Sequence, residues 1–331
     1  MRKNKTFGYL TAEELGIRNN IAILPCGSLD SEQPALWTAE DLKPYASYMP
    51  EDRALDSLFG GFVFKPVLSS GRRYFDPLYV GFRPPANRQD WEEWILDLFR
   101  EGVQLHALAE AGSDRPDVWI TLPYPHPHLR DFGNPYDPAR ESLNFTRNQD
   151  RLEALKWWIG EWLEAWSKHR SIGQKLRFAG FVWPRDSIGS SDLQLVKTVN
   201  AHLRSLGLKS MWICNYGSLG ADQWKRLGFD AAVVYSNYTG TGPYDIGWLR
   251  NACLFAKAIR TGILIVKGRG VIYSEGHFDD YLRCGLPENQ DFMGAALKVY
   301  SFPQHSLTEW MRSEPEQYEK LYRFIKGTFR G

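Results

Sequence analysis

Carboxylate side chains that follow short apolar runs are the residues of this sequence best suited to catalysis. Asp186 stands three residues past the run Phe178–Trp183, and Glu275 stands eight residues past Lys267, where another run ends. Asp76 lies in a polar stretch nearer the N-terminus. Cleavage of a glycosidic bond uses two carboxyl groups, and the acid must keep its proton until the leaving oxygen takes it. Asp186 is therefore one catalytic candidate, with Glu275 or Asp76 as its partner.

Aromatic and polar residues gather at the same kind of position, at or shortly after the end of an apolar run. The C–H faces of a sugar stack on indole and phenol rings, and its hydroxyl groups hydrogen bond to amides, imidazoles and charged groups. We therefore expect a carbohydrate-binding surface at these positions. Its predicted members are Lys65, Tyr124, His126, Trp183, Arg185, Asn215, Tyr216, Tyr235, Asn237, Tyr238 and Lys267.

Other chemistries have weaker support in the sequence. His126 and His128 form a His-Pro-His run, but two ligands on one loop without a third are a weak signal for a metal. Lys267 could form a Schiff base, yet no phosphate-binding or cofactor-binding motif accompanies it. Asp186 could instead cap a helix or pair with Arg185, and the basic residues could bind an acidic sugar. We predict no metal and no cofactor.

Eight short apolar runs alternate with longer segments of helical period. The runs are Asn20–Pro25, Gly61–Pro66, Val118–Pro123, Phe178–Trp183, Ser210–Cys214, Ala231–Tyr235, Ile263–Lys267 and Lys298–Phe302. The segments are Thr38–Tyr48, Gln89–Glu110, Asn148–Lys168, Ser191–Leu206, Leu219–Leu227, Gly247–Ile259, Asp279–Cys284 and Leu307–Lys326. Runs that are apolar throughout are typical of parallel strands covered by helices. The pattern predicts an α/β fold, a (β/α)₈ TIM barrel, whose active groups lie at the C-terminal ends of the strands.

Length and composition agree with one barrel domain. The chain has 331 residues, and we expect residues 1–331 to form a single domain with its core at about 20–327 and long loops after the second and third strands. A net charge of +1 gives no reason to expect nucleic acid or an anionic membrane surface. No signal peptide or membrane span is visible, so the sequence as written predicts a cytoplasmic protein, whereas a trimmed secreted chain would look the same.

Several segments together carry a resemblance to a known family. LWTAEDLKPYASYM, GGFVF, DWEEWILDLF, VWITLPYP, GFVWPRD, LGLKSMWICNYG and RLGFDAAVVYSNY occur in that order. This series resembles the domain of unknown function 4855 family, from about Ile21 to Cys284. The resemblance implies a bacterial barrel related to glycoside hydrolases, without an agreed reaction. The resemblance implies an acidic residue after the fourth strand, and Asp186 stands there. It also implies glutamates on the seventh strand, where this chain has Leu264 and Val266 instead.

The leading hypothesis is a carbohydrate-active barrel, a glycoside hydrolase acting on a bacterial or environmental oligo- or polysaccharide. A barrel that binds a glycan, or scaffolds another protein, without catalysis is the first alternative, favoured by the missing glutamates of the seventh strand. A metal-dependent hydrolase built on the His-Pro-His run is the second. The sugar, the linkage and the oligomeric state do not follow from the sequence.

Overall fold

Eight parallel strands close into a barrel at the centre of the protein. The computed structural model describes residues 7–27, 36–50, 56–75, 83–112, 114–137, 139–303 and 306–331. Around the barrel the strands follow the order β1-β10-β9-β8-β7-β6-β5-β4. Their bounds are β1 (Ile21–Cys26), β4 (Gly61–Pro66), β5 (Asp117–Thr121), β6 (Arg177–Trp183), β7 (Lys209–Asn215), β8 (Ala231–Tyr235), β9 (Gly262–Val266) and β10 (Lys298–Ser301). The predicted (β/α)₈ barrel is confirmed, and each predicted run overlaps one of these strands.

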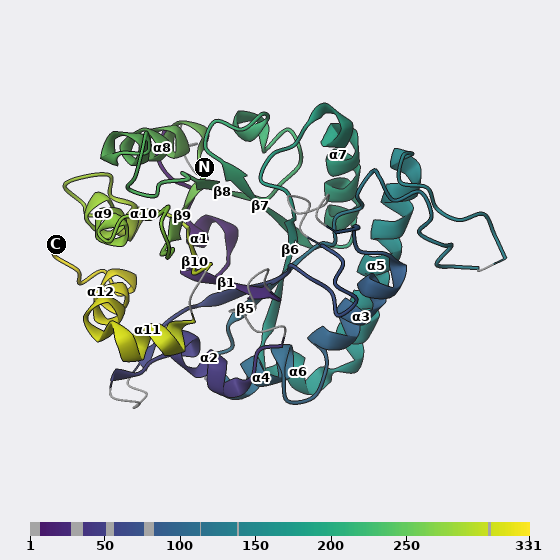
Figure 1. Ribbon diagram of the computed structural model, residues 1–331, viewed down its shortest axis with the longest axis horizontal. Coiled ribbons are helices and arrows are strands. Elements are labelled where there is room, and N and C mark those ends of the chain that lie inside the picture. Colours follow the sequence, from purple (N-terminus) through teal and green to yellow (C-terminus); the bar gives the residue numbers. More distant parts are fainter. Residues whose placement is uncertain are drawn as a thin grey trace.

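Helices surround the barrel on its outside (Figure 1). The longer ones are α2 (Ala39–Ala46), α3 (Arg88–Leu98), α4 (Gln104–Ala111), α5 (Asn148–Lys168), α7 (Ser190–Ser205), α8 (Ile246–Ile259), α9 (His277–Cys284) and α12 (Pro315–Ile325). Shorter elements are α1 (Ala12–Leu15), α6 (Arg170–Lys175), α10 (Phe292–Ala295), α11 (Leu307–Ser313), the 3₁₀ turn η3 (Ala221–Gln223) and the two-stranded sheet of β2 (Ser47–Tyr48) and β3 (Asp56–Ser57). The described residues contain no helix long and apolar enough to cross a membrane.

The predicted helices differ from the observed ones where backbone chemistry interrupts the helical pattern. The segment Gln89–Glu110 forms two helices, because a turn with Gly102 at a φ of 77° separates α3 from α4. The segment Leu307–Lys326 also divides, because Pro315 has no N–H to continue α11 and instead begins α12. The helix predicted at Leu219–Leu227 is wrong, and that segment contains only η3.

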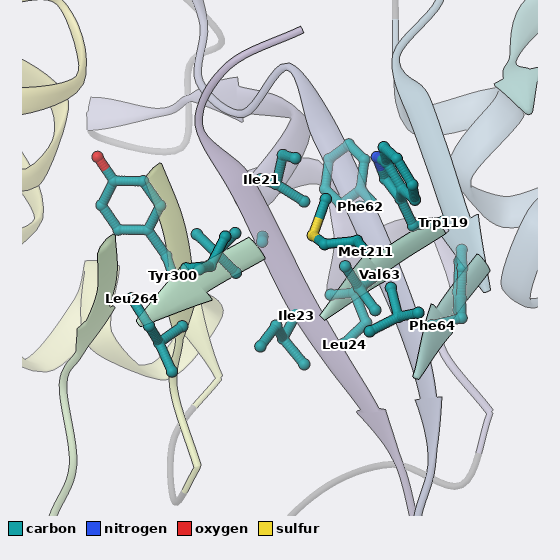
Figure 2. Packing of buried hydrophobic residues seen from close by; sticks show 14 of the residues in the cluster. Ile21, Ile23, Leu24, Phe62, Val63, Phe64, Trp119, Met211, Leu264 and Tyr300 are labelled. Atoms are coloured by element: carbon teal, nitrogen blue, oxygen red, sulfur yellow. The ribbon is translucent and has the colours of Figure 1, made fainter. Parts of the chain in front are cut away.

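The register of the strands decides which side chains face into the barrel. Phe181 on β6 contacts Trp158 and Trp162 of α5, so it faces the helices, and its neighbour Val182 faces inward. Val182 pairs with Met211 of β7, and paired residues in a parallel sheet point to the same face. Continuing the pairing around the barrel gives the inward set. It includes Ile21, Ile23, Val63, Trp119, Met211 and Leu264, which are buried and are drawn in Figure 2 with outward neighbours.

Gly180 makes room for the strand next to β6. A Cβ atom at this position would lie 2.2 Å from the backbone oxygen of Lys209 and 3.0 Å from the ring of Trp119. We therefore expect Gly180→Ala to lower the free energy of unfolding by at least about 3 kcal/mol, because β6 and β7 would have to separate. Gly160 in α5 is the matched control, since its Cβ would meet nothing within 4 Å.

Gly160→Ala should stabilise the protein by about 1 kcal/mol, because alanine favours a helix interior over glycine. Urea denaturation of both variants checks the pair. Equal stability of Gly180→Ala and the wild type would contradict the close approach of the two strands.

Candidate active site at the barrel mouth

The barrel opens to solvent at the C-terminal ends of its strands. The inward residues Lys65 on β4, Asn215 on β7 and Tyr235 on β8 are each partly exposed, whereas the outward residues just before them, Phe64, Cys214 and Val234, are buried. On β7 the inward residue one layer below, Ile213, is partly exposed as well. We call the solvent-accessible surface that these inward residues form at the mouth the basin. This is the end of a barrel at which loops converge and enzymes of this fold place their reactive groups.

Asp186 lies in this mouth and is held there by β7. The side-chain amide of Asn215 donates a hydrogen bond to its carboxylate at 2.5 Å, and the backbone N–H of Asn215 donates to its carbonyl oxygen at 2.9 Å. The indole N–H of Trp212 donates to the carbonyl oxygen of Arg185 at 2.7 Å. Asp186 is not a helix cap, because α7 begins after Gly189. The loop after β6 is thus fixed so that its carboxylate stands beside the inward residue of β7.

Several buried polar atoms around Asp186 have no protein partner among the described residues. They are the side-chain oxygen atoms of Asn215 and Thr121 and Nε of Arg185. Thr121 pairs with Val182 and therefore also faces inward. Buried polar atoms are nearly always hydrogen bonded, so these acceptors and donors are suited to a polar ligand or to ordered water in the basin.

A buried ion pair supports the side of the mouth formed by β5 and β6. Arg151 of α5 donates to Asp192 of α7 at 2.8 Å, and the two side chains are 1% and 0% exposed. The hydroxyl of Tyr124 donates to Asp192 at 2.9 Å and accepts from Arg185 at 3.1 Å. Burial, with a further contribution from the charge of Asp192, raises the pKa of the Tyr124 hydroxyl, which therefore remains a donor. Arg151 and Asp192 were not among the predicted site residues.

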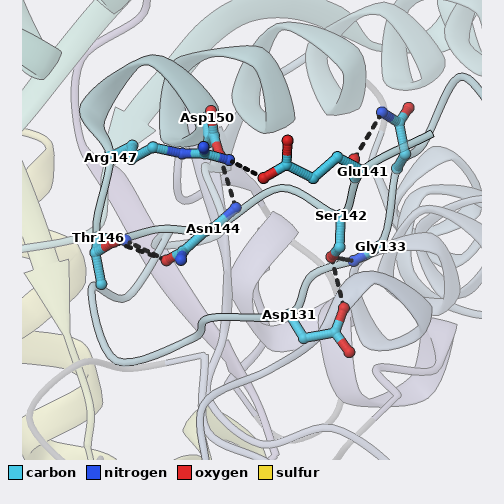
Figure 3. Close-up of polar contacts among 9 residues, drawn as sticks. Asp131, Gly133, Glu141, Ser142, Asn144, Thr146, Arg147 and Asp150 are labelled. Atoms are coloured by element: carbon cyan, nitrogen blue, oxygen red, sulfur yellow. Dashed lines mark hydrogen bonds and ion pairs between the residues drawn. The ribbon is translucent and has the colours of Figure 1, made fainter.

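The long loop after β5 is held together by its own polar side chains (Figure 3). Asp150 accepts from the backbone N–H of Asn144 at 2.7 Å and from the guanidinium of Arg147 at 2.8 Å. The hydroxyl of Ser142 donates to Asp131 at 2.5 Å. The carboxylates of Asp131 and Asp150 are therefore engaged in the structure of the loop rather than available opposite Asp186.

Other predicted residues pack into the protein or lie at its surface. The rings of Tyr124, Trp183 and Tyr238 are only 4%, 3% and 2% exposed, so protein atoms cover them. Tyr238 hydrogen bonds to Asp280, and Tyr216 packs against Trp248 and Phe255 of α8.

The remaining predicted residues are also dispersed. Lys267 is 8% exposed and pairs with Glu314 at 3.1 Å. Asn237 is partly buried with a φ of 57°, and Glu275 is exposed in the turn before α9. Asp76 lies outside the described residues. Of the predicted residues, Asp186 and Asn215 are in contact at the mouth, Arg185 and Tyr235 are their neighbours in sequence and in strand pairing, and Lys65 stands at the same end of the barrel on β4.

The two histidines of the His-Pro-His run stack edge to face, with ring centroids 4.7 Å apart. The described residues contain no group of three histidine, cysteine, aspartate or glutamate side chains that could hold a metal ion. The backbone N–H of His128 donates to Nδ1 of His126 at 3.3 Å, which requires that nitrogen to carry no proton. Burial and the neighbouring His128, Arg185 and Arg151 lower the pKa of His126 to about 4.

The fold and the mouth define a (β/α)₈ barrel with a polar site at the C-terminal ends of its strands. The profile of the domain of unknown function DUF4855 matches residues 20–326, and the chain belongs to that family. A search of curated proteins finds no match.

Solved structures with a similar fold are distant in sequence. A GH5-4 broad specificity endoglucanase from an uncultured bacterium shares 11% identity over 98% of both chains, with a TM-score of 0.49. SrfJ from Salmonella typhimurium shares 10% over 92% of this chain and 69% of its own, with a TM-score of 0.47. A mutant of the O-GlcNAc hydrolase of Thermobaculum terrenum shares 13% over 94% and 63%, with a TM-score of 0.38. Likeness at this level assigns no activity to the chain.

The buried ion pair allows a prediction about stability. Arg151→Met leaves the charge of Asp192 buried with only Tyr124 and Arg185 beside it, and should lower the free energy of unfolding by about 3–5 kcal/mol. Adding Asp192→Asn removes that charge and should recover part of the loss. A double-mutant cycle measured by urea denaturation tests this coupling. Additive effects of the two substitutions would show that the pair is not coupled.

The environment of His126 allows a prediction about pH. Its folded pKa is depressed, so the unfolded chain takes up this proton first as the pH falls below about 6.5. The stability that the neutral ring contributes is therefore lost between about pH 6.5 and 4, and stability rises with pH in that window. His126→Gln should lose less stability than the wild type over this range, with His106→Gln as the control for removing a histidine. The free energy of unfolding is measured as a function of pH for each protein. If it changes in parallel for the wild type and His126→Gln, the lowered pKa of His126 is contradicted.

Proposed function

We propose that the protein binds a carbohydrate in the barrel mouth and cleaves a glycosidic bond there with Asp186. The observation that carries the proposal is the position of this carboxylate beside Asn215, in a partly exposed basin with buried, unsatisfied polar atoms. A glycoside hydrolase needs a fixed carboxyl group at the scissile oxygen or the anomeric carbon. The double attachment of Asp186 to Asn215 supplies that fixed position.

The neighbouring groups suit the two kinds of surface that a sugar presents. The side-chain oxygens of Asn215 and Thr121 accept hydrogen bonds from hydroxyl groups, and Nε of Arg185 donates one. Tyr235 is an inward and partly exposed ring, so it can stack on a C–H face. A ligand with alternating polar edges and apolar faces therefore fits this basin better than a purely apolar or purely ionic one.

The partner carboxylate of Asp186 decides whether binding leads to cleavage. Leu264 and Val266 face inward on β9 and are 4% and 2% exposed, so the glutamates implied for these positions are replaced by packed apolar groups. Among the described residues, Glu275 follows on the loop after β9 and is exposed. Asp76 stays a candidate outside the described residues.

Recognition of a glycan without cleavage is the second candidate function. The apolar side chains of Leu264 and Val266 favour it, because they leave no inward carboxylate on β9 opposite Asp186. The two functions make the same demand on binding residues and differ only in the release of reducing ends.

Asp186→Asn separates the two functions in one experiment. The wild type and the variant are incubated with neutral, acidic and amino-sugar polysaccharides, and both binding and new reducing ends are measured. We expect the wild type to release reducing ends and the variant to lose about 100-fold to 10,000-fold of that rate, because asparagine cannot transfer the proton. Binding should change little.

Asp114→Asn is the matched control, because Asp114 is an exposed aspartate just before β5, at the opposite end of the barrel. It should keep the wild-type rate. Binding without release by the wild type would replace hydrolysis with recognition. A wild type that binds none of the polysaccharides would refute the proposal.

A further inference from the structure

A row of aromatic rings leads outward from the mouth over the start of α8. Tyr216 directly follows Asn215, and its ring centroid lies 5.0 Å from that of Trp248 in an edge-to-face contact. The ring centroid of Tyr244 lies 5.1 Å from that of Trp248 in a similar contact. The indole N–H of Trp248 donates to the carbonyl oxygen of Ser236 at 2.5 Å. Ser236 directly follows the inward residue Tyr235, so the row starts within one residue of the basin.

The loops after β8 and β9 are fastened together beside this row. The hydroxyl of Thr241 donates to the carbonyl oxygen of Ile272 at 2.7 Å, and the backbone N–H of Ser274 donates to the carbonyl oxygen of Thr239 at 2.9 Å. Gly240, with a φ of 72°, leaves no space for a side chain against Ser274. The two loops therefore form one fixed surface at the rim of the mouth.

This surface exposes several large apolar side chains. Tyr244 is 37% exposed, Ile272 is 56% exposed and Val271 is fully exposed. With Leu219 on the loop after β7, they make four of the nine large hydrophobic side chains that are exposed in the described part of the chain. Single exposed apolar residues are common on soluble proteins, but four of them on three consecutive loops at the mouth, two of which are hydrogen bonded to each other, give this end of the barrel an apolar rim suited to contact with a ligand.

The charges of the two loops are largely engaged elsewhere. Asp245 caps α8 through the backbone N–H of Trp248, Arg269 pairs with Glu309 at 2.6 Å, and Lys267 pairs with Glu314. The surface that remains combines rings and aliphatic groups with threonine and serine hydroxyls, and Glu275 adds one exposed carboxylate at its edge. This mixture matches the faces and hydroxyl edges of a neutral sugar and matches poorly the charged head groups of a membrane.

We propose that Tyr244, supported by Trp248, forms an outer subsite that holds a further sugar unit of the polysaccharide bound in the mouth. The inference rests on the proposed function and makes it more specific, since it assigns a long chain rather than a mono- or disaccharide as ligand. Tyr216 contacts the other side of the row at Trp248. The rim residues Val271 and Ile272 border the path of the chain.

The test compares long and short ligands on the same variants. The wild type, Tyr244→Ala, Tyr244→Phe and Tyr136→Ala are measured by affinity electrophoresis in gels containing xylan, mixed-linkage β-glucan or glycol chitin, and by calorimetry with the corresponding disaccharides. Tyr136 is the matched control, because it is a 60% exposed tyrosine on the loop after β5. Tyr244→Ala should weaken binding of the retained polysaccharide about tenfold, while Tyr244→Phe and Tyr136→Ala bind as the wild type does.

Disaccharide binding distinguishes a lost subsite from a damaged mouth, and in Tyr244→Ala it should stay close to that of the wild type. Equal retention of Tyr244→Ala and the wild type would overturn the subsite and leave the proposed function intact. Loss of disaccharide binding in Tyr244→Ala would also overturn it, because the residue would then belong to the mouth. A wild type retained by none of the three polysaccharides and bound by none of the disaccharides would refute both proposals.

Discussion

Closure of eight parallel strands into a barrel determines which side chains can meet a ligand. Alternate residues face inward and most of them fill the core, so among strand residues chiefly those near the C-terminal ends, such as Lys65, Asn215 and Tyr235, reach the basin. Every other functional group must come from a loop and needs its own support. Asp186 meets this requirement through two hydrogen bonds from Asn215, which tie the loop after β6 to a strand of the barrel.

The supporting groups differ in kind around the mouth. Beside β5 and β6 the support is ionic, because Arg151 and Asp192 join α5 and α7 underneath Tyr124 and Arg185. Beside β8 and β9 it is largely apolar, because aromatic contacts and hydrogen bonds between two loops take the place of a fully buried ion pair. A fully buried ion pair gains specificity of position more than net stability. The ionic side therefore suits exact placement of polar groups, and the apolar side suits contact over a wider area.

The sequence predicted the strands well and the direction of their side chains poorly. Runs such as Phe178–Trp183 are apolar on both faces, so their positions are visible, but the period of two that separates inward from outward residues is not. Trp183 and Tyr216 therefore looked equivalent to Asn215 as mouth residues, although both pack outward. Arg151 and Asp192 lie 41 residues apart inside helices, and nothing in their local sequence signals the pair.

The apolar side chains of Leu264 and Val266 on β9 have a consequence for the chemistry of the mouth. Leu264 and Val266 are packed among inward neighbours, so a carboxylate cannot be restored there without burying a charge that has no partner. Under the proposed function, any second acid must then reach Asp186 from a loop. Glu275 stands one residue past Ser274, whose backbone N–H donates to the carbonyl oxygen of Thr239, so it lies on the loop that is fastened to the loop after β8. The hydrogen bonds that border the outer subsite would therefore also hold the backbone that carries this candidate acid.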